Sequence, residues 1–259
     1  MSSLKSGAFS SGDKAQIRFM NIRIDNLTYP EAIANACEMI DDGGKHFIVT
    51  PNVDHIVRLE SDEELTEIYK NADMVLCDGK PLIWISKLYG NPIKEKISGS
   101  DFLPGLCEIA SERGYTMFLF GAGPGVAKLA GENLSRKYHG LKIAGWYSPP
   151  YGFESDPEEL SEAIRAINEA DPDILVVALG CPKQEKFIYR YRDQIKAKLS
   201  LGLGASLDFE AGVVKRAPVV MQKCGLEWLF RITQDPKRLA RRYLIDDMKI
   251  IPLIFKYKD

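Results

Sequence analysis

The chain has 259 residues, 45% of them hydrophobic and 27% charged, which is enough to bury one large core with or without an appendage. Its five cysteines occur singly, without a C-x-x-C pair, which argues against a disulfide framework or a zinc site and favours a reducing compartment. The polar N-terminus and the lack of any run of roughly 18 apolar residues argue against a secreted or membrane-spanning protein. We therefore expect a cytoplasmic protein.

The net charge of −2 is unevenly distributed along the chain. Residues 211–259 hold 11 Lys and Arg against 5 Asp and Glu, a net +6, whereas the rest of the chain holds 23 against 31, a net −8. Such a basic segment predicts a polyanion or an anionic membrane surface as partner. The alternative is a solvated basic helix that packs on the acidic body of the same chain.

After a polar tail over residues 1–20, short apolar runs rich in Val, Ile and Phe alternate with helical patterns. This alternation predicts an α/β fold, a Rossmann-like and mostly parallel sheet with helices on both faces. The core is expected over residues 21–212. The predicted strands are HFIVTP at 46–51, MVLCDG at 74–79, TMFLFG at 116–121, LKIAGWY at 141–147, ILVVALG at 174–180 and LSLGLG at 199–204.

Several helix starts are marked by capping residues. Thr28 with Glu31 and Ser61 with Glu64 have capping-box spacing, and Asp156 precedes a first-turn proline. Beyond residue 212 the strands stop, and a basic helical appendage is expected over 213–259, with helices at 224–232 and 236–247. On the second of these helices Arg238, Arg241 and Arg242 are spaced i, i+3 and i+4, which predicts one basic face.

Polar or glycine-rich residues follow the predicted strands at residues 50–52, 77–79, 121–123, 180–185 and 204–206. The carboxyl ends of parallel strands meet at one edge of a sheet, where open α/β folds bind ligands. One such segment alone is typical of an ordinary turn. Five on one edge indicate a binding crevice.

Asp78 is the most suggestive carboxylate, because it follows a buried strand without an adjacent basic residue. It is a candidate general base if burial raises its pKa, and the alternative is a turn or cap residue. Gln184 and Glu185 fall in the first turn after ILVVALG, where we expect ligand contacts.

The glycines Gly121 and Gly123 lie between a strand and a helix, which allows either a phosphate contact or a purely steric turn. A nicotinamide-dependent oxidoreductase is the alternative function, although the spacing is not G-x-G-x-x-G and the next strand lacks a terminal acid. Asp171 and Asp173 form a D-x-D pattern, but they precede a strand and are expected in a loop at the opposite edge. The three histidines show no metal spacing, and only His55 is expected near the site.

Five segments together resemble the WecG/TagA/CpsF family of glycosyltransferases over about residues 22–247. They are TPN at 50–52, NADMVLCDG at 71–79, LGCPKQE at 179–185, GASLDFEAGVVKRAP at 204–218 and GLEWLFR at 225–231. The resemblance implies a Rossmann-like core and an inverting, metal-independent transfer of N-acetylmannosamine or a related sugar. It further implies a UDP donor, a polyprenyl-diphosphate-linked acceptor, and a product used for teichoic acid or other surface polysaccharides.

Carried over to this sequence, the resemblance makes Asp78 the catalytic base and Thr50, Asn52 and Gln184 contacts of the transferred sugar. It assigns substrate-binding roles to the C-terminal arginines Arg231, Arg238 and Arg241. At Lys96 the chain departs from the family, which usually has arginine there. Lysine supplies charge without the bidentate fork of a guanidinium group.

These expectations define the partners and the location. We expect no cofactor, no metal and no nucleic acid, and a peripheral position on the inner face of the cell membrane. A homo-oligomer is possible. A non-catalytic membrane scaffold is a third alternative, although it leaves TPN and PKQE unexplained.

Overall fold

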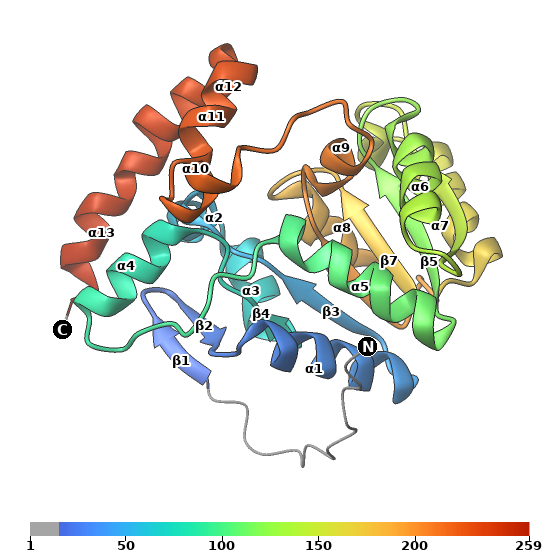
Figure 1. Cartoon of the computed structure of the whole chain (residues 1–259), viewed down its shortest axis with the longest axis horizontal. Helices are drawn as coiled ribbons and strands as arrows, with labels where there is room; N and C mark the ends of the chain where they lie inside the picture. Colours follow the sequence, from blue (N-terminus) through green and yellow to red (C-terminus); the bar gives the residue numbers. More distant parts are fainter. Residues whose placement is uncertain (1–15, 259) are drawn as a thin grey trace.

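Six parallel strands form the central sheet of the protein, for which the computed structural model describes residues 16–258 (Figure 1). The strand order is β4-β3-β8-β7-β5-β6, and every pair in this sheet is parallel. All six predicted strands are confirmed. They are β3 (His46–Val49), β4 (Met74–Val75), β5 (Thr116–Gly121), β6 (Lys142–Tyr147), β7 (Ile174–Ala178) and β8 (Leu199–Gly202).

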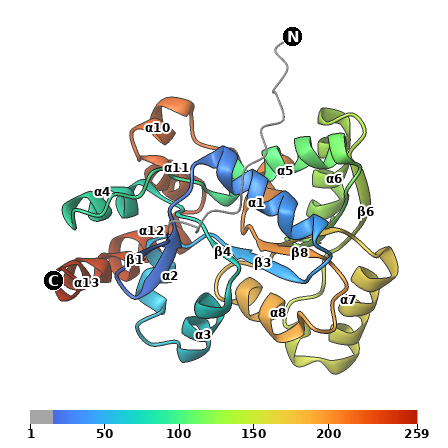
Figure 2. The same cartoon turned by 90° about the horizontal axis from the view of Figure 1, so that it is seen from below.

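Helices cover both faces of this sheet. Successive side chains of a strand point to opposite faces, and the strands carry apolar side chains on both, so each face needs a helix layer to bury it. On β3, Phe47 and Val49 pack into one core cluster and Ile48 into the other. Figure 2 shows the two helix layers. The Ile48 side is covered by α1 (Tyr29–Asp41), α5 (Gly99–Arg113) and α6 (Val126–Lys137), and the Phe47 side by α3 (Glu63–Asn71), α7 (Pro157–Ala170) and α8 (Lys183–Tyr191).

Two of the three predicted helix caps are confirmed. The Thr28 backbone N–H donates to Glu31 Oε2 at 2.6 Å in a capping box, and Asp156 accepts from the first turn of α7. The third prediction, Ser61, is wrong by one residue, because Asp62 Oδ1 accepts from the backbone of Leu65 at 3.0 Å. A carboxylate at a helix N-terminus also interacts favourably with the helix dipole, which a hydroxyl does not.

A hairpin that the sequence did not predict precedes the core. Its strands β1 (Gln16–Phe19) and β2 (Ile22–Asp25) pair antiparallel, so residues 16–20 are part of the fold and not of a tail. The expectation for residues 1–15 lies outside the described residues. Asp25 attaches the hairpin to the sheet, because its Oδ2 accepts from the Val75 backbone at 2.8 Å.

The C-terminal helices, residues 219–256, pack beside the core. They comprise α10 (Val219–Lys223), α11 (Glu227–Gln234), α12 (Pro236–Arg241), a π-helical turn (Arg242–Asp246), a 3₁₀ turn (Asp247–Lys249) and α13 (Ile250–Lys256). Both predicted helices are present, and the second continues beyond residue 247. The remaining helices are α2 (Val53–Arg58), α4 (Lys80–Leu88), the 3₁₀ turn Phe153–Ser155 and α9 (Ser206–Glu210).

Glu60 holds the end of this segment against the core. Its carboxylate accepts from Lys256 Nζ at 2.5 Å and from the Tyr257 hydroxyl at 2.8 Å, and also from Asn21 of the hairpin at 2.7 Å. The Tyr89 hydroxyl donates to the Ile254 carbonyl at 2.9 Å. Among the described residues, no helix is both long and apolar enough to cross a bilayer.

Candidate active site

A pocket of about 340 Å³ lies between the carboxyl edge of the sheet and the C-terminal helices. The segments that follow β3 and β4 form its floor, and α11 and the π-helical turn form its roof. Asn52, Asp78 and Lys96 line the floor, and Trp228, Arg231 and Arg242 line the roof. The pocket therefore joins the two parts of the chain that differ in charge.

Asp78 is fixed by its backbone at the end of β4. Its N–H donates to the Pro51 carbonyl at 2.9 Å, so the segments after β3 and β4 are hydrogen-bonded beyond the strands. The side chain is surrounded by protein but keeps an exposed edge toward the pocket. Burial raises the pKa of Asp78, while Lys96 and Arg231 act in the opposite direction. A carboxylate in this setting is a better proton acceptor than one in water.

Arg231 of α11 lies in the pocket roof and is the roof arginine whose charge acts on Asp78. Burial disfavours its charge, but interactions with Tyr243, Asp78 and Glu227 outweigh burial and raise its pKa. Its guanidinium group also lies 5.2 Å from the centroid of the Phe209 ring. Arg231 thus presents a permanent positive charge close to the candidate base.

Asn52 connects the floor to the roof. As the N-cap of α2, its Oδ1 accepts from the Asp54 backbone at 3.1 Å, and it lies 3.3 Å from Arg242 Nη2. Arg242 also lies 3.5 Å from Asp54, whose carboxylate is buried. The sequence placed both Arg241 and Arg242 on the basic face of this helix. Helical spacing alone did not show which of the two arginines lines the pocket.

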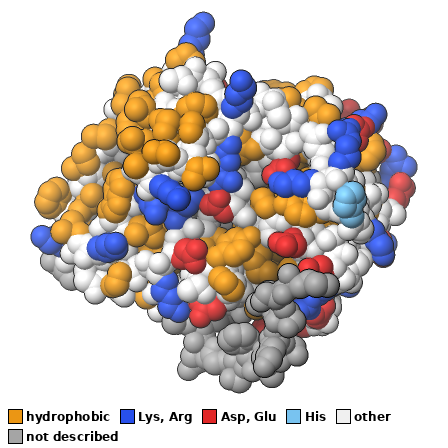
Figure 3. All heavy atoms as spheres, viewed as in Figure 1, with side chains coloured by type: hydrophobic (Ala, Val, Ile, Leu, Met, Phe, Trp, Pro, Cys, Tyr) orange, Lys and Arg blue, Asp and Glu red, His pale blue; other side chains and the backbone are white. Residues whose placement is uncertain are grey.

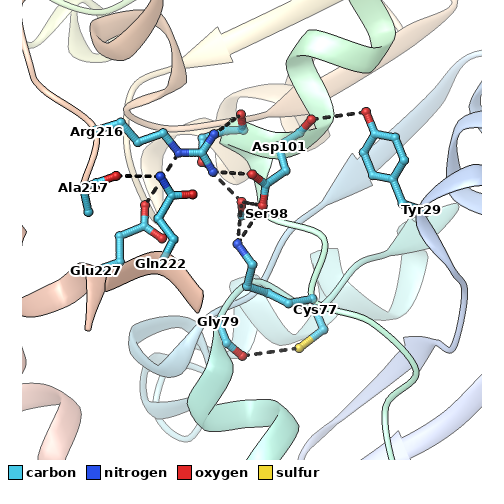
Figure 4. Close-up of polar contacts among 11 residues, drawn as sticks. Tyr29, Cys77, Gly79, Ser98, Asp101, Arg216, Ala217, Gln222 and Glu227 are labelled. Atoms are coloured by element: carbon cyan, nitrogen blue, oxygen red, sulfur yellow. Dashed lines mark hydrogen bonds and ion pairs between the residues drawn. The ribbon is translucent and has the colours of Figure 1, made fainter. Parts of the chain in front are cut away.

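Lys96 is held in a polar network below the roof. Its Nζ donates to Asp101 Oδ2 at 2.6 Å, and Ser98 Oγ donates to the same oxygen at 2.5 Å. Arg216 pairs with the other oxygen of Asp101 and donates to the Ser100 carbonyl at 3.2 Å. Figure 4 shows Arg216 facing Asp101 and Ser98. Burial raises the pKa of Asp101, but these donors outweigh it and lower the pKa to about 2.

Three predicted contacts, Thr50, Gln184 and Glu185, are buried and do not line the pocket. Thr50 follows β3 and is 6% exposed, but it does not line the pocket. The Gln184 amide is occupied within the protein: its Oε1 accepts from the backbones of Gly180 at 3.2 Å and Gly204 at 3.0 Å, and its Nε2 donates to Glu185 Oε1 at 2.8 Å. Gln184 therefore connects two glycine turns at the carboxyl edge.

The glycine turn after β5 lies away from the pocket. A Cβ on Gly121, whose φ is +96°, would come 2.6 Å from the Ala178 carbonyl oxygen, so this position needs glycine for packing against β7. The Ser148 hydroxyl lies 2.9 and 3.3 Å from the carbonyls of Gly121 and Gly123. These contacts favour the steric interpretation of the turn over a phosphate contact.

The remaining predicted residues are separated from the pocket or lie outside what is described. Arg241 is exposed and does not line it, and the side chain of Arg238 lies outside the described atoms. Asp173 is at the opposite edge of the sheet, as predicted, where it accepts from Thr116 at 2.8 Å and Lys198 at 2.7 Å. Sequence reasoning missed Glu227 and Tyr243, because only the docked helices bring them to the pocket.

A parallel α/β sheet that presents a shielded carboxylate and several cations to one pocket is the arrangement of a group-transfer enzyme. The chain matches the model of the glycosyl transferase WecG/TagA/CpsF family over residues 17–259, and it belongs to this family.

Curated relatives agree with this family. The chain is 33% identical over 226 residues to a Bacillus subtilis protein (84% of this chain, 85% of the relative) and 32% identical over 219 residues to a Bacillus spizizenii protein (85% and 82%). It is 28% identical over 246 residues to a Staphylococcus aureus protein (94% and 92%). All three relatives are named N-acetylglucosaminyldiphosphoundecaprenol N-acetyl-beta-D-mannosaminyltransferase.

Proposed function

We propose that this glycosyltransferase moves N-acetylmannosamine or a related hexose from a UDP-sugar to a sugar linked to polyprenyl diphosphate, with inversion at the anomeric carbon. The observation that carries the proposal is the position of Asp78, whose pKa is raised, opposite Arg231 in one pocket. The names of the relatives support the acceptor and the sugar. The UDP donor and the inverting course follow from the family resemblance, which also selects Asp78 as the base among the pocket carboxylates Asp78, Glu227 and Asp247.

The reaction is a single displacement. Asp78 accepts the proton of the acceptor hydroxyl while the hydroxyl oxygen attacks the anomeric carbon of the donor sugar. The bond between that carbon and the diphosphate oxygen breaks, and UDP leaves with the bonding electron pair. One displacement from the opposite face inverts the anomeric configuration.

The departing diphosphate is stabilised by cations of the protein itself. Arg231, Arg242 and Lys96 all line the pocket, and positive groups placed before the reaction stabilise the developing charge more strongly than mobile water does. No metal ion at the diphosphate is required in this scheme. Because Lys96 is already paired with Asp101, we assign the larger contribution to the two arginines.

We propose that the enzyme works at the inner membrane face, and the lipid-linked acceptor in the names of the relatives supports a position at the membrane. Exposed apolar side chains gather on the C-terminal helices and the adjoining α4, where Figure 3 shows a continuous hydrophobic area. The residues are Trp84, Leu88, Val219, Val220, Leu226, Leu229, Leu244, Ile245, Met248, Ile251 and Phe255. We call these residues the apolar patch. Its position beside the pocket roof would bring the site close to a lipid surface.

The test is a donor screen with a short-chain prenyl-diphosphate N-acetylglucosamine acceptor, followed by mass spectrometry and proton NMR of the product. We expect transfer from UDP-N-acetylmannosamine with the anomeric configuration inverted, and undiminished rates without added Mg²⁺ or Mn²⁺. Retention of configuration would exclude Asp78 as the base of a single displacement. Absence of transfer from every UDP-sugar would exclude the donor class.

The alternative of a nicotinamide-dependent oxidoreductase has no support from the pocket. The glycine turn on which it depended packs against β7, and neither Gly121 nor Gly123 lines the pocket.

A further inference from the structure

A cluster of three potential metal ligands, two of them buried and one partly buried, lies behind the pocket floor. His55 belongs to α2, Cys181 to the turn after β7, and Glu185 to α8. One potential ligand atom from each residue lies within 4.8 Å of the other two. His55 is 5% exposed and Glu185 is 1% exposed, and none of the three lines the pocket. The cluster is therefore separate from the proposed diphosphate site.

The hydrogen bonds of Asn52 fix the orientation of the imidazole. Asn52 Oδ1 lies 2.8 Å from His55 Nδ1 and accepts from the Asp54 backbone as well, whereas the Asn52 backbone N–H lies 3.3 Å from the same ring nitrogen. An amide oxygen only accepts, so the shorter contact assigns the proton to Nδ1. The other ring nitrogen, Nε2, then faces the cluster. A histidine ligand in a metal site usually donates its second N–H to a neighbouring oxygen in this way.

The separation of His55 and Glu185 suits coordination better than a direct hydrogen bond. His55 Nε2 and Glu185 Oε1 are 3.4 Å apart, beyond the usual range of about 2.7–3.2 Å for N–H···O bonds. Two nitrogen or oxygen ligands bound about 2.0–2.1 Å from a tetrahedral zinc ion lie roughly 3.3–3.4 Å from each other. The two side chains thus have the separation of neighbouring ligands.

Unpartnered polar atoms provide an independent observation. Glu185 Oε2 is buried without a hydrogen-bond partner, and so is the hydroxyl of Tyr69, whose ring centroid lies 6.3 Å from that of His55. A buried carboxylate oxygen without a partner is costly, and a bound cation would remove that cost.

We propose that His55, Cys181 and Glu185 bind a divalent cation of the zinc class, which joins α2 to α8 and orients Asn52 at the pocket floor. The nitrogen, sulfur and oxygen donors fit zinc, whereas magnesium and calcium select oxygen ligands. On binding, the Cys181 thiol releases its proton to solvent, and the thiolate sulfur donates an electron pair to the cation. The site has a positioning role and takes no part in bond cleavage.

The competing state is a metal-free ion pair. Burial lowers the pKa of His55, but Cys181 and Glu185 outweigh burial and raise it well above its ordinary value. A protonated imidazole facing Glu185 would then replace the cation. The two states differ in metal content and in the spectrum of a cobalt derivative.

The experiment uses the full chain, purified without a histidine tag from zinc-supplemented cells and dialysed before elemental analysis. We expect about one equivalent of zinc per chain. After replacement by Co²⁺, a thiolate-to-cobalt charge-transfer band should appear in the near ultraviolet. Neither measurement depends on transferase activity, so failure of the proposed function would leave both readouts unchanged.

Variants locate the site. Cys181→Ser should remove the charge-transfer band, whereas Cys224→Ser, at an exposed cysteine, should retain it. Asn52→Ala should weaken zinc binding by roughly 10- to 100-fold, because the imidazole loses its orienting partner. Wild-type protein without zinc, or a cobalt spectrum without a thiolate band, would overturn the proposal even if Cys181→Ser failed to fold. A band that persists in folded Cys181→Ser would also overturn it.

Discussion

At the scale of single residues, the reactivity of Asp78 depends on opposing influences within one pocket. Burial raises its pKa, and Lys96 and Arg231 limit the rise, so the ionised carboxylate is a stronger base than an aspartate in water. Arg231 contributes in two ways, because it also faces the position proposed for the leaving group. Substitutions at Arg231 are therefore expected to change both basicity and leaving-group stabilisation.

Asp78→Asn should fold normally and lose roughly 10²- to 10⁴-fold in kcat, because the amide keeps the shape but accepts no proton. Circular dichroism and steady-state transfer assays measure the two effects. Asp173→Asn, at the opposite edge of the sheet, is the control and should retain kcat. Turnover close to wild type in Asp78→Asn at saturating substrates would exclude the proposed base.

The pH profile should show the raised pKa of Asp78 directly. Because the carboxylate is active only when ionised, kcat/KM should increase with pH on the acid side, with a midpoint above the ordinary aspartate value of 3.8. This acid limb should be absent from the residual activity of Asp78→Asn. An identical limb in the variant would assign the titration to another group.

At the scale of elements, one ion-pair network joins the core to the segment that carries the roof. Asp101 of α5 accepts from Lys96 of the floor and from Arg216, which precedes α10. Its lowered pKa of about 2 means that the folded state favours the ionised form. This contribution to stability is fully present above pH 3.8 and is lost as the pH falls toward 2.

Asp101→Asn should destabilise the protein by about 1–2 kcal/mol at pH 7, since a hydrogen-bonded charge pair is replaced by a neutral contact. The difference from wild type should decrease in urea titrations as the pH is lowered from 4 toward 2. Asp41→Asn, at a half-exposed pair with Arg113, is the control and should change stability by less than about 1 kcal/mol. Equal losses in both variants would contradict a special role for Asp101.

The roof itself contains an unfavourable carboxylate. The pKa of Asp247 is raised to about 6, mainly by burial. The nearby carboxylates Asp54 and Asp246 contribute to the rise, and Arg242 opposes it. Asp247 Oδ1 has no hydrogen-bond partner. A raised pKa means that the folded state prefers the protonated form. The cost to stability is therefore full above about pH 6 and disappears as the pH falls through 6 toward 3.8.

Asp247→Asn should stabilise the protein by about 1 kcal/mol at pH 7.5, an amount reduced from the full pKa effect because the side chain is partly exposed. Thermal unfolding at pH 7.5 and pH 5 should show the gain only at the higher pH. Asp246→Asn is the matched control, since the Asp246 side chain is 38% exposed and lies 3.5 Å from Lys249 Nζ. A lower melting temperature for Asp247→Asn would show that the electrostatic attraction between Asp247 and Arg242 outweighs the cost of burial.

At the scale of the whole molecule, the apolar patch and the basic C-terminal helices occupy the same side as the pocket roof (Figure 3). Leu129 on α6, 37% exposed, is a large exposed hydrophobic side chain outside this area. The contrast provides a direct comparison between patch and non-patch side chains.

Ile245→Ser combined with Phe255→Ser should weaken binding to anionic vesicles by roughly 10-fold or more, because two well-exposed apolar side chains lose their lipid contacts. Co-sedimentation with phosphatidylglycerol-containing vesicles measures the effect. Leu129→Ser should bind like wild type. Binding that is insensitive to the double substitution would move the membrane contact to another surface.

The sequence predicted the sheet well because each strand is a short apolar run buried on both faces, and burial of this kind leaves a local pattern. It did not predict the N-terminal hairpin, whose four-residue strands depend on Asp25 binding the Val75 backbone 50 positions away. In the site, Asn52, Asp78, Lys96 and Arg231 reach the pocket as expected. Gln184 does not line it, because its amide is used by two glycine turns.

Local sequence spacing did not predict that Arg242 lines the pocket or that His55, Cys181 and Glu185 lie together, because both depend on how distant segments pack. Which arginine of a basic helix turns toward the core is decided by how the helix docks, here through Asp54 and Asn52. The cluster brings His55 to Cys181 and Glu185, which lie more than a hundred positions further along the chain. Only the tertiary fold brings such side chains together.

The arrangement of a pocket with its floor in the core and its roof near the C-terminus also fixes an order of events during synthesis. The last strand of the sheet ends at Gly202 and the last helix ends at Lys256, 54 residues later. At about 5–20 residues per second, the ribosome needs roughly 3–10 s to make that interval. Until Arg231 and Arg242 have been made within this interval and their helices have docked, Asp78 lies at an open strand edge without them above it. A nascent chain can thus possess its sheet and the proposed base before the arginines of the pocket roof are in place.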